Sequence, residues 1–373
     1  MVEDNVYNSY MEVNLTKLKA NFERVRAHIG SNVDIIPILK GNGYGLGGIE
    51  LAKFYVNEFG VKIIGNAQVR ESVEMRKAGI DCELLVIGGV PFNNIPAAVQ
   101  YSLQTTAFEK EYVDLLNEEA ARQGKTAEIQ IKINTGMNRI GIKPGSDLIN
   151  FAEFLKTKRN IKVRGAFTHF AESRAEDHSF SIQQFKLFKQ GIEEIEAEGI
   201  ELDYIHACNS GATAWFTEAY CTTVRLGNLL LGYDPVDSLD IERAVTWRCF
   251  VTQIKTLQTG DTLGYYRYFL ATNPIRVATI SMGFGDGYFR PMMMKGGYVL
   301  INGKQCRFLG ASMDQAYLDV DDVPDIVLNN EVTLLGKDGD HEITPFDWGN
   351  FTCESFVFLN SLMNKRIKRV YIK

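Results

Sequence analysis

Several features are missing or scarce in this 373-residue sequence, and each absence excludes a class of protein. No run of about 18 apolar residues occurs, so we expect no segment of this chain to cross a bilayer. The net charge is -6 and the sequence contains no block of basic residues, and both features argue against a nucleic-acid partner. The six cysteines include no C-x-x-C pair, and the five histidines show no H-x-x-x-H spacing. We therefore expect a reducing environment without disulfides, and no metal site.

The composition and the amino terminus indicate a globular protein of more than one domain. Hydrophobic residues make up 45% of the chain and charged residues 23%. The length is more than one ordinary core needs, and suits a large domain with a smaller one. Residues 1–14 are polar and acidic and do not resemble a signal peptide. We expect a cytoplasmic location, either as a free protein or as the cytoplasmic domain of a membrane-anchored one.

Residues 13–240 alternate regularly between short β-branched runs and longer amphipathic segments. The expected strands are Val33–Lys40, Val61–Ala67, Leu84–Gly89, Leu103–Ala107, Ala127–Ile133, Val163–Phe170, Tyr204–Asn209 and Thr222–Gly227. The expected helices include Leu15–Ile29, Ile49–Phe59, Arg70–Ala78, Lys110–Arg122 and Gln183–Glu198. Eight strands alternating with helices over about 220 residues favour an α/β protein with a (β/α)8 barrel. A doubly wound sheet is the competing architecture.

The pattern changes near residue 240. Short strands separated by turns such as Thr259-Gly260-Asp261 and Asn302-Gly303 follow, and helical spacing is scarce until the end. This predicts a second, mostly β C-terminal domain at residues 241–373. Residues 1–12 precede the first barrel helix, and we expect Tyr10–Val13 to add a strand to this second domain.

The most informative stretch is ILKGNGYG at residues 38–45. Lys40 ends an apolar run, and a lysine held at the end of a buried strand is desolvated, so its amine loses a proton more easily. Such an amine can form a Schiff base with an aldehyde cofactor. The glycines let the backbone pass close to a bulky ligand, and Tyr44 offers a hydroxyl. Taken alone, Lys40 could equally be a solvated lysine at a strand exit.

Other chemically useful residues fall at the ends of the predicted barrel strands, where barrels place their active sites. They are Lys132 and Arg139 around the fifth strand, His169 after the sixth, Asn209 and Ser210 after the seventh, and Arg225, Gly227 and Asn228 around the eighth. Small and hydroxylated residues after the last two strands are suited to a phosphate. Each residue alone has a structural alternative: a core histidine, a salt-bridge arginine, a helix-capping serine. Because all of them are expected on one rim of the barrel, an active site is favoured over these separate structural roles.

These motifs resemble those of alanine racemases, the type III pyridoxal-phosphate (PLP) enzymes, over essentially the whole chain. The matching segments, in order, are ILKGNGYG (38–45), INTGMNRIG (133–141), THFA (168–171), HACNS (206–210), GDTLGY (260–265), ISMGFGDGY (280–288) and SMDQ (312–315). The resemblance implies a homodimer with shared active sites, a barrel that binds PLP, and a β domain that supplies the second base to the partner.

The resemblance also implies a role for each residue. Lys40 would bind the cofactor and act as base on one face of the substrate, and Tyr265 as base on the opposite face, because one base alone returns the proton to its original side. The other implied cofactor-binding residues are Tyr44, His169, Asn209, Ser210, Arg225, Gly227 and Asn228. An arginine facing the pyridine nitrogen does not give up its proton, which would weaken the electron sink and suppress side reactions. Arg139 and the Met313 N–H would bind the substrate carboxylate, with Lys132 (in carbamylated form) and Asp314 in supporting positions.

Departures from the family pattern concern the substrate. Phe284 replaces a usual tyrosine, and Gly310 stands where a substrate-channel arginine is common. No tyrosine occurs at residues 360–366, where the family places one against the substrate side chain. We expect Asn364, or less favourably Asn360, to leave room and a polar partner for a β-hydroxyl. The chain thus resembles the racemase domain of vancomycin-resistance serine/alanine racemases, and we expect turnover of both serine and alanine.

Three alternatives remain open from the sequence. A strict alanine racemase is the first. A type III PLP decarboxylase is the second, although neither its glycine-triplet phosphate loop nor its cysteine near the second face is found. A non-catalytic PLP carrier is the third, and it should lack residues 241–373 altogether.

Overall fold

The computed structural model of the protein describes residues 6–233, 239–288, 292–293, 296–352 and 364–373. It falls into two compact units, which we describe separately. One contains Lys19–Gly43 and Gly47–Glu242. The other contains Met1–Leu18, Tyr44–Leu46 and Arg243–Lys373. The short segment that follows the Lys40 turn therefore belongs with the carboxyl-terminal unit.

Eight parallel strands line the first unit, which confirms the predicted α/β barrel. They are β2 (Asp34–Pro37), β3 (Ile63–Asn66), β4 (Glu83–Val86), β5 (Gln104–Ala107), β6 (Ala127–Lys132), β7 (Ile161–Phe167), β8 (Tyr204–His206) and β9 (Thr223–Leu226). Strands β3 to β8 form one parallel sheet in sequence order, and β2 pairs with β9. Backbone hydrogen bonds join these two sheets: Leu39 N–H donates to Gly65 O at 2.9 Å, Thr222 N–H to Ile205 O at 3.1 Å, and Arg225 N–H to Cys208 O at 3.0 Å. The competing doubly wound sheet is wrong.

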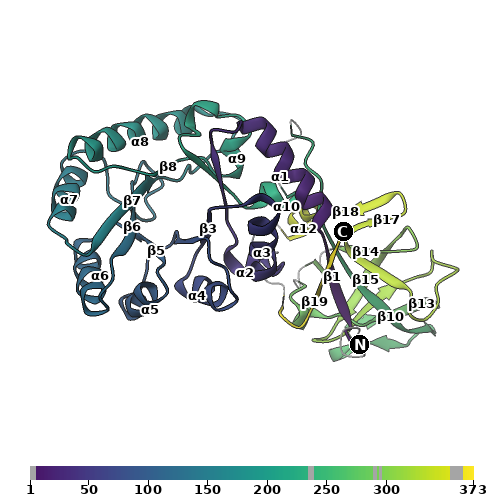
Figure 1. Ribbon diagram of the computed structural model, residues 1–373. Coiled ribbons are helices and arrows are strands. Elements are labelled where there is room, and N and C mark those ends of the chain that lie inside the picture. The colour runs from purple at the N-terminus through teal and green to yellow at the C-terminus, as the bar shows by residue number, and fades with distance from the viewer. Residues whose placement is uncertain (1–5, 234–238, 289–291, 294–295, 353–363) are drawn as a thin grey trace. The chain divides into compact units, whose positions relative to one another are not determined.

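Helices surround this ring of strands, and Figure 1 shows α4 to α8 on its outer side. The main helices are α1 (Leu15–Ile29), α3 (Gly48–Phe59), α4 (Val69–Lys77), α5 (Ile95–Gln100), α6 (Lys110–Arg122), α7 (Ser146–Lys156) and α8 (Ser179–Ala197). In α8 the residues with helical spacing, Phe185, Phe188, Ile192 and Ile195, are all buried. This burial is the reason that the apolar periodicity was readable in the sequence.

The second unit is built on a nine-stranded sheet with the order β18-β17-β14-β15-β16-β13-β10-β1-β19. Its strands are β1 (Ser9–Asn14), β10 (Val245–Leu257), β13 (Ile275–Ile280), β14 (Tyr298–Ile301), β15 (Lys304–Ala311), β16 (Ala316–Asp319), β17 (Glu331–Asp338), β18 (His341–Ile343) and β19 (Lys368–Ile372). A further pairing of β17 with β10 makes the sheet close on itself. Strand β1, from the amino terminus, lies between β10 and β19 (Figure 1).

The described part of the second unit also contains a β11–β12 hairpin (Thr262–Leu263 and Phe269–Leu270), two 3-10 turns and helix α12 (Pro345–Thr352). Among the described residues, no helix is both long and apolar enough to span a bilayer.

Candidate active site

The predicted barrel residues lie at the carboxyl-terminal ends of their strands, as a parallel barrel requires. Lys40 follows β2, Arg139 lies in the loop after β6, and His169 follows β7. Ser210 begins the short helix α9 (Ser210–Thr213) after β8. Arg225 lies within β9 and is 4% exposed. The fold thus brings residues that are far apart in sequence to one rim.

Lys40 stands at the start of a tight left-handed turn. Gly41, Asn42 and Gly43 have φ values of 63°, 56° and 64°, a region that glycine tolerates without strain. A Cβ at Gly43 would lie 2.9 Å from the Leu51 side chain, so the turn also needs glycine for space. Burial first and the charge of Arg139 second lower the pKa of the Lys40 amine. Both effects favour the neutral, nucleophilic amine.

Arg225 is held by five hydrogen bonds from its two terminal nitrogens. Nη1 contacts His206 Nδ1 at 2.8 Å and His206 O at 2.9 Å. Nη2 donates to Thr168 O at 2.8 Å and Ala207 O at 2.9 Å, and contacts His169 Nδ1 at 3.3 Å. None of these contacts uses the Nε–H, which is therefore the donor left for a ligand. Burial lowers the pKa of Arg225 to about 10, so its guanidinium stays protonated at neutral pH.

The predicted phosphate cradle has a donor arranged for an anion. Ser210 Oγ accepts hydrogen bonds from Gly227 N–H at 3.2 Å and Leu229 N–H at 3.4 Å. Because both lone pairs of the Ser210 oxygen accept these hydrogen bonds, the hydroxyl proton can donate to a phosphate oxygen. Asn209 has a different use, because its Oδ1 accepts from Ala212 N–H at 3.0 Å and caps α9.

Lys132 is 3% exposed, and its main-chain oxygen accepts a hydrogen bond at 2.9 Å from the N–H of Ile142, in the segment that follows Arg139. Its Nζ donates to Ile133 O at 3.0 Å and lies over the Phe167 ring. Burial, followed by the charges of Arg225 and Arg139, lowers its pKa well below the usual range. Both effects favour the neutral amine, which is the form that reacts with carbon dioxide.

The second unit carries the remaining predicted residues, and Tyr265 is among its most exposed aromatic side chains at 75%. It begins the turn Tyr265–Arg267, directly after Gly264 with φ of 76°. The next two residues, Tyr266 and Arg267, also have positive φ values, of 58° and 52°. Backbone in this region is strained for residues other than glycine, and such strain is often found at functional turns.

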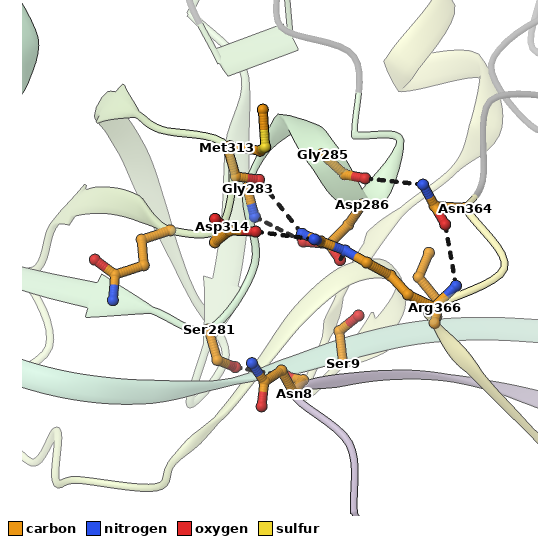
Figure 2. A network of polar contacts seen from close by, with 12 residues as sticks. Asn8, Ser9, Ser281, Gly283, Gly285, Asp286, Met313, Asp314, Asn364 and Arg366 are labelled. Atoms are coloured by element: carbon orange, nitrogen blue, oxygen red, sulfur yellow. Dashed lines mark hydrogen bonds and ion pairs between the residues drawn. The ribbon is translucent and has the colours of Figure 1, made fainter.

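Met313 lies in a loop that Arg366 holds through hydrogen bonds and ion pairs (Figure 2). Arg366 Nε contacts Asp286 Oδ1 at 2.5 Å, its Nη1 contacts Asp314 Oδ1 at 2.8 Å, and its Nη2 donates to Met313 O at 3.4 Å. Gly285 N–H donates to the same Met313 carbonyl at 2.8 Å. The backbone of the Met313 loop is thus held from two sides, while the Met313 residue itself is 58% exposed.

Asn364 is tied into this loop. Its Nδ2 donates to Gly285 O at 3.1 Å, and its Oδ1 accepts from Arg366 N–H at 3.1 Å (Figure 2). These bonds use its carbonyl oxygen and one amide hydrogen, so a role towards a substrate hydroxyl gains no support from this geometry. The other predicted asparagine, Asn360, lies outside the described residues.

Comparison with known proteins supports the resemblance over the whole length of the chain. The profile of the alanine racemase N-terminal domain matches residues 13–235, and that of the C-terminal domain matches residues 244–371. An alanine racemase of Carboxydothermus hydrogenoformans is 33% identical and covers 97% of this chain and 99% of its own. Alanine racemase 2 of Caldanaerobacter subterraneus is 31% identical, with coverages of 99% and 96%.

The chain belongs to the alanine racemase family. Solved structures agree: the alanine racemase of Clostridium difficile superposes with a TM-score of 0.93 at 26% identity, covering 99% of this chain and 96% of its own. A histidine racemase from Leuconostoc mesenteroides shares the fold, with a TM-score of 0.87 at 24% identity and 99% coverage of both chains.

Members of the alanine racemase family use pyridoxal 5'-phosphate, and the residues present here fit that group. Lys40 offers an amine of lowered pKa at the barrel rim, Ser210 a hydroxyl proton, and Arg225 an unused Nε–H. An aldehyde requires such an amine as nucleophile, and a phosphate oxygen and a ring nitrogen each require a hydrogen-bond donor. Nothing in the comparisons shows the finer resemblance to vancomycin-resistance serine/alanine racemases.

The sequence analysis placed His169 among the cofactor-binding residues and gave no role to His206, although both histidines contact Arg225. The structure gives His206 the shorter contact, 2.8 Å against 3.3 Å. A signal was available, since His206 and Gln130 are polar residues inside apolar strands, and a buried polar side chain needs a partner. Parallel strand pairing was needed to identify that partner.

Proposed function

We propose that this protein is a PLP-dependent alanine racemase, an isomerase that interconverts L- and D-alanine with two opposed bases. The observation that carries the proposal is that two residues lie on one barrel rim: Lys40, whose amine has a pKa lowered by burial, and Arg225, which stays protonated and keeps its Nε–H for a ligand. The close relatives described above are alanine racemases, and they favour this reading over combined serine and alanine turnover.

We assign the cofactor to Lys40, Ser210 and Arg225, with Tyr44, His169, Gly227 and Asn228 completing its surroundings and Asn209 supporting it through α9. When bound, pyridoxal phosphate supplies the electron sink that makes the substrate Cα–H acidic. Arg225 contributes a donor that keeps its proton, because its pKa of about 10 lies well above neutral pH. The ring nitrogen then stays unprotonated, which limits the sink and disfavours side reactions.

Lys40 takes or gives the Cα proton on one face of the substrate. We assign the opposite face to the phenol of Tyr265 of the partner subunit, in a homodimer with shared active sites. Arg139 and the main-chain N–H of the partner subunit's Met313 bind the substrate carboxylate, and Asp314 supports that loop through Arg366. Under this proposal residues 13–240 bind the cofactor, and residues 241–373, joined by the strand in residues 1–12, supply the second base.

The proposal is tested by chiral analysis of products from L-alanine, L-serine and L-histidine. We expect rapid formation of D-alanine and slow or no formation of the other two D-amino acids. Comparable turnover of L-serine would restore the serine/alanine reading, and preferred turnover of L-histidine would show that the substrate has changed on this fold. Release of carbon dioxide would favour a decarboxylase instead. No turnover of any of the three, with cofactor bound, would favour a carrier.

A mixed-dimer experiment tests the shared site. Lys40→Ala and Tyr265→Phe should each abolish racemisation. In a mixed dimer of the two variants, one site combines both substitutions and the other carries an intact Lys40 and an intact Tyr265. Mixing two inactive proteins should therefore restore activity, whereas sites confined to one subunit would stay inactive.

A further inference from the structure

A row of buried polar side chains crosses the barrel interior, from the cofactor rim to the opposite end. Arg225 Nη1 contacts His206 Nδ1 at 2.8 Å, and His206 Nε2 contacts Gln130 Oε1 at 2.6 Å. Gln130 Nε2 donates to Gln104 Oε1 at 2.7 Å, and Gln104 Nε2 donates to Glu83 Oε2 at 2.5 Å. Arg225, His206, Gln130 and Gln104 are each 4% exposed or less. We call these four residues with Glu83 the barrel chain.

At the end far from Arg225, the barrel chain reaches carboxylates that form ion pairs with an arginine. Gln104 Nε2 also lies 3.3 Å from Glu128 Oε2. Arg164 binds both carboxylates, with contacts of 3.0 Å to Glu83 and 2.7 Å to Glu128, and a third of 2.7 Å to Asp203. Both carboxylates accept hydrogen bonds from this guanidinium, and a carboxylate in such an ion pair acts as an acceptor only.

The two ends of the barrel chain fix every proton between them. Glu83 only accepts, so Gln104 must present its amide N–H₂ to it and its oxygen to Gln130. Gln130 must then donate to Gln104 and offer its own oxygen to His206. His206 must carry its proton on Nε2, which leaves Nδ1 as an acceptor. Arg225 only donates, and it requires this acceptor. Both ends therefore impose the same direction.

Strand geometry explains why these residues meet. Thr106 of β5 pairs with Gln130 of β6, and Phe167 of β7 pairs with His206 of β8. Alternate side chains of adjacent barrel strands point inward in layers, so polar residues placed on several strands form a continuous line. The Phe167 ring stacks on His206 with centroids 4.9 Å apart and planes 5° apart, which holds the imidazole in the plane of its two hydrogen bonds.

We propose that Gln104 and Gln130 are positioning residues that act through His206: anchored on the carboxylates of Glu83 and Glu128, they hold the neutral Nε2–H tautomer that keeps Arg225 directed at the cofactor ring. This rests on the proposed function, because the ring partner of Arg225 is the cofactor. Without Gln130 the buried Nε2–H of His206 has no acceptor, and the imidazole must rotate or shift, which removes the Nδ1 acceptor from Arg225.

The first test reads the tautomer of His206 directly in the cofactor-bound wild-type protein. Nitrogen-15 NMR of histidine-labelled protein, with His206→Gln to assign the signal, should show protonated Nε2 and unprotonated Nδ1. This pattern should persist from about pH 6 to about pH 9, a span that crosses the ordinary histidine pKa. A protonated Nδ1 in that span would overturn the proposal without any barrel variant having to fold.

The second test measures the dissociation constant of pyridoxal phosphate and the His206 signals in Gln130→Leu and Gln104→Leu. Gln130→Leu should raise the dissociation constant about tenfold, the usual effect of leaving one buried donor unpaired, and should shift the His206 Nε2 resonance. Gln104→Leu, one link further away, should change both in the same direction but by less.

Tyr112→Phe is the matched control. It removes a buried 2.8 Å hydrogen bond between Tyr112 and Thr105, a neighbour of Gln104 on β5 but outside the barrel chain. It should lower the thermal midpoint and leave cofactor binding and the His206 signals unchanged. Unchanged cofactor binding in both glutamine variants, or an equal change in Tyr112→Phe, would overturn the proposal. Neither measurement needs turnover, so a chain that binds the cofactor but fails to racemise would refute the proposed function alone.

Discussion

Removing the Arg366 guanidinium tests whether the Met313 loop is held by charge. Arg366 pairs with Asp286, whose side chain is 7% exposed, and with Asp314, whose side chain is 65% exposed. Breaking a fully buried pair costs about 3–5 kcal/mol, whereas exposed pairs contribute about 0.2–1 kcal/mol. The Arg366 side chain is 43% exposed, so water reaches part of this pair. We therefore expect Arg366→Ala to lower the free energy of unfolding by about 2 kcal/mol.

The assay combines denaturant unfolding with steady-state kinetics. Arg307→Ala is the control, because Arg307 pairs with Asp319 at 2.9 Å on the surface of the same sheet, with side-chain exposures of 62% and 20%. That variant should lose at most about 1 kcal/mol and keep its kinetics. Arg366→Ala should in addition raise KM for L-alanine, because the released loop carries the Met313 N–H that we assign to the substrate carboxylate, while cofactor binding stays unchanged.

Two results would contradict this reasoning. If Arg366→Ala were no less stable than Arg307→Ala, the Asp286 carboxylate would be satisfied without the guanidinium. If stability fell but KM stayed at the wild-type value, the arginine would support the sheet and the Met313 loop would hold its shape without it.

Three further predictions concern other parts of the protein. Lys132, whose pKa is lowered by burial and by Arg225 and Arg139, should show a carbamate resonance in ¹³C NMR with labelled bicarbonate that Lys132→Ala lacks; an unmodified lysine would count against it. Gly310→Ala should reduce kcat and leave cofactor affinity intact, since its Cβ would lie 2.9 Å from the Tyr268 ring next to the Tyr265 turn; unaltered kcat would show that Tyr268 moves freely. His169 and His206 have pKa values well below 6.5 when folded, so the unfolded chain binds more protons below that pH and stability falls as pH drops. Unfolding free energies at pH 7.5 and pH 5.5 should show this fall and a smaller one in His206→Gln; an unchanged value between the two pH conditions would mean that both imidazoles charge in the folded state.

Much of the barrel was readable because its strands and helices bury continuous or periodic apolar faces. The run Ala127–Ile133 predicted β6, and the spacing in Gln183–Glu198 predicted α8. The positions of Lys40, Ser210 and Arg225 followed from a single rule, that parallel strands end together. That Asn364 faces the substrate stays a prediction; its hydrogen bonds to Gly285 and Arg366 could not be read from the sequence, because they depend on the tertiary structure.

The sequence by itself determined the barrel, the β domain and the glycine turn that follows Lys40, since periodic burial and a glycine turn are local properties of the chain. Only the tertiary structure decided which side chains form hydrogen bonds with one another. Gln104, Gln130 and His206 are separated by up to 102 positions along the chain, yet they form one line of hydrogen bonds behind Arg225. The reason is physical: buried polar groups must find partners, and strand register selects which partners lie within reach.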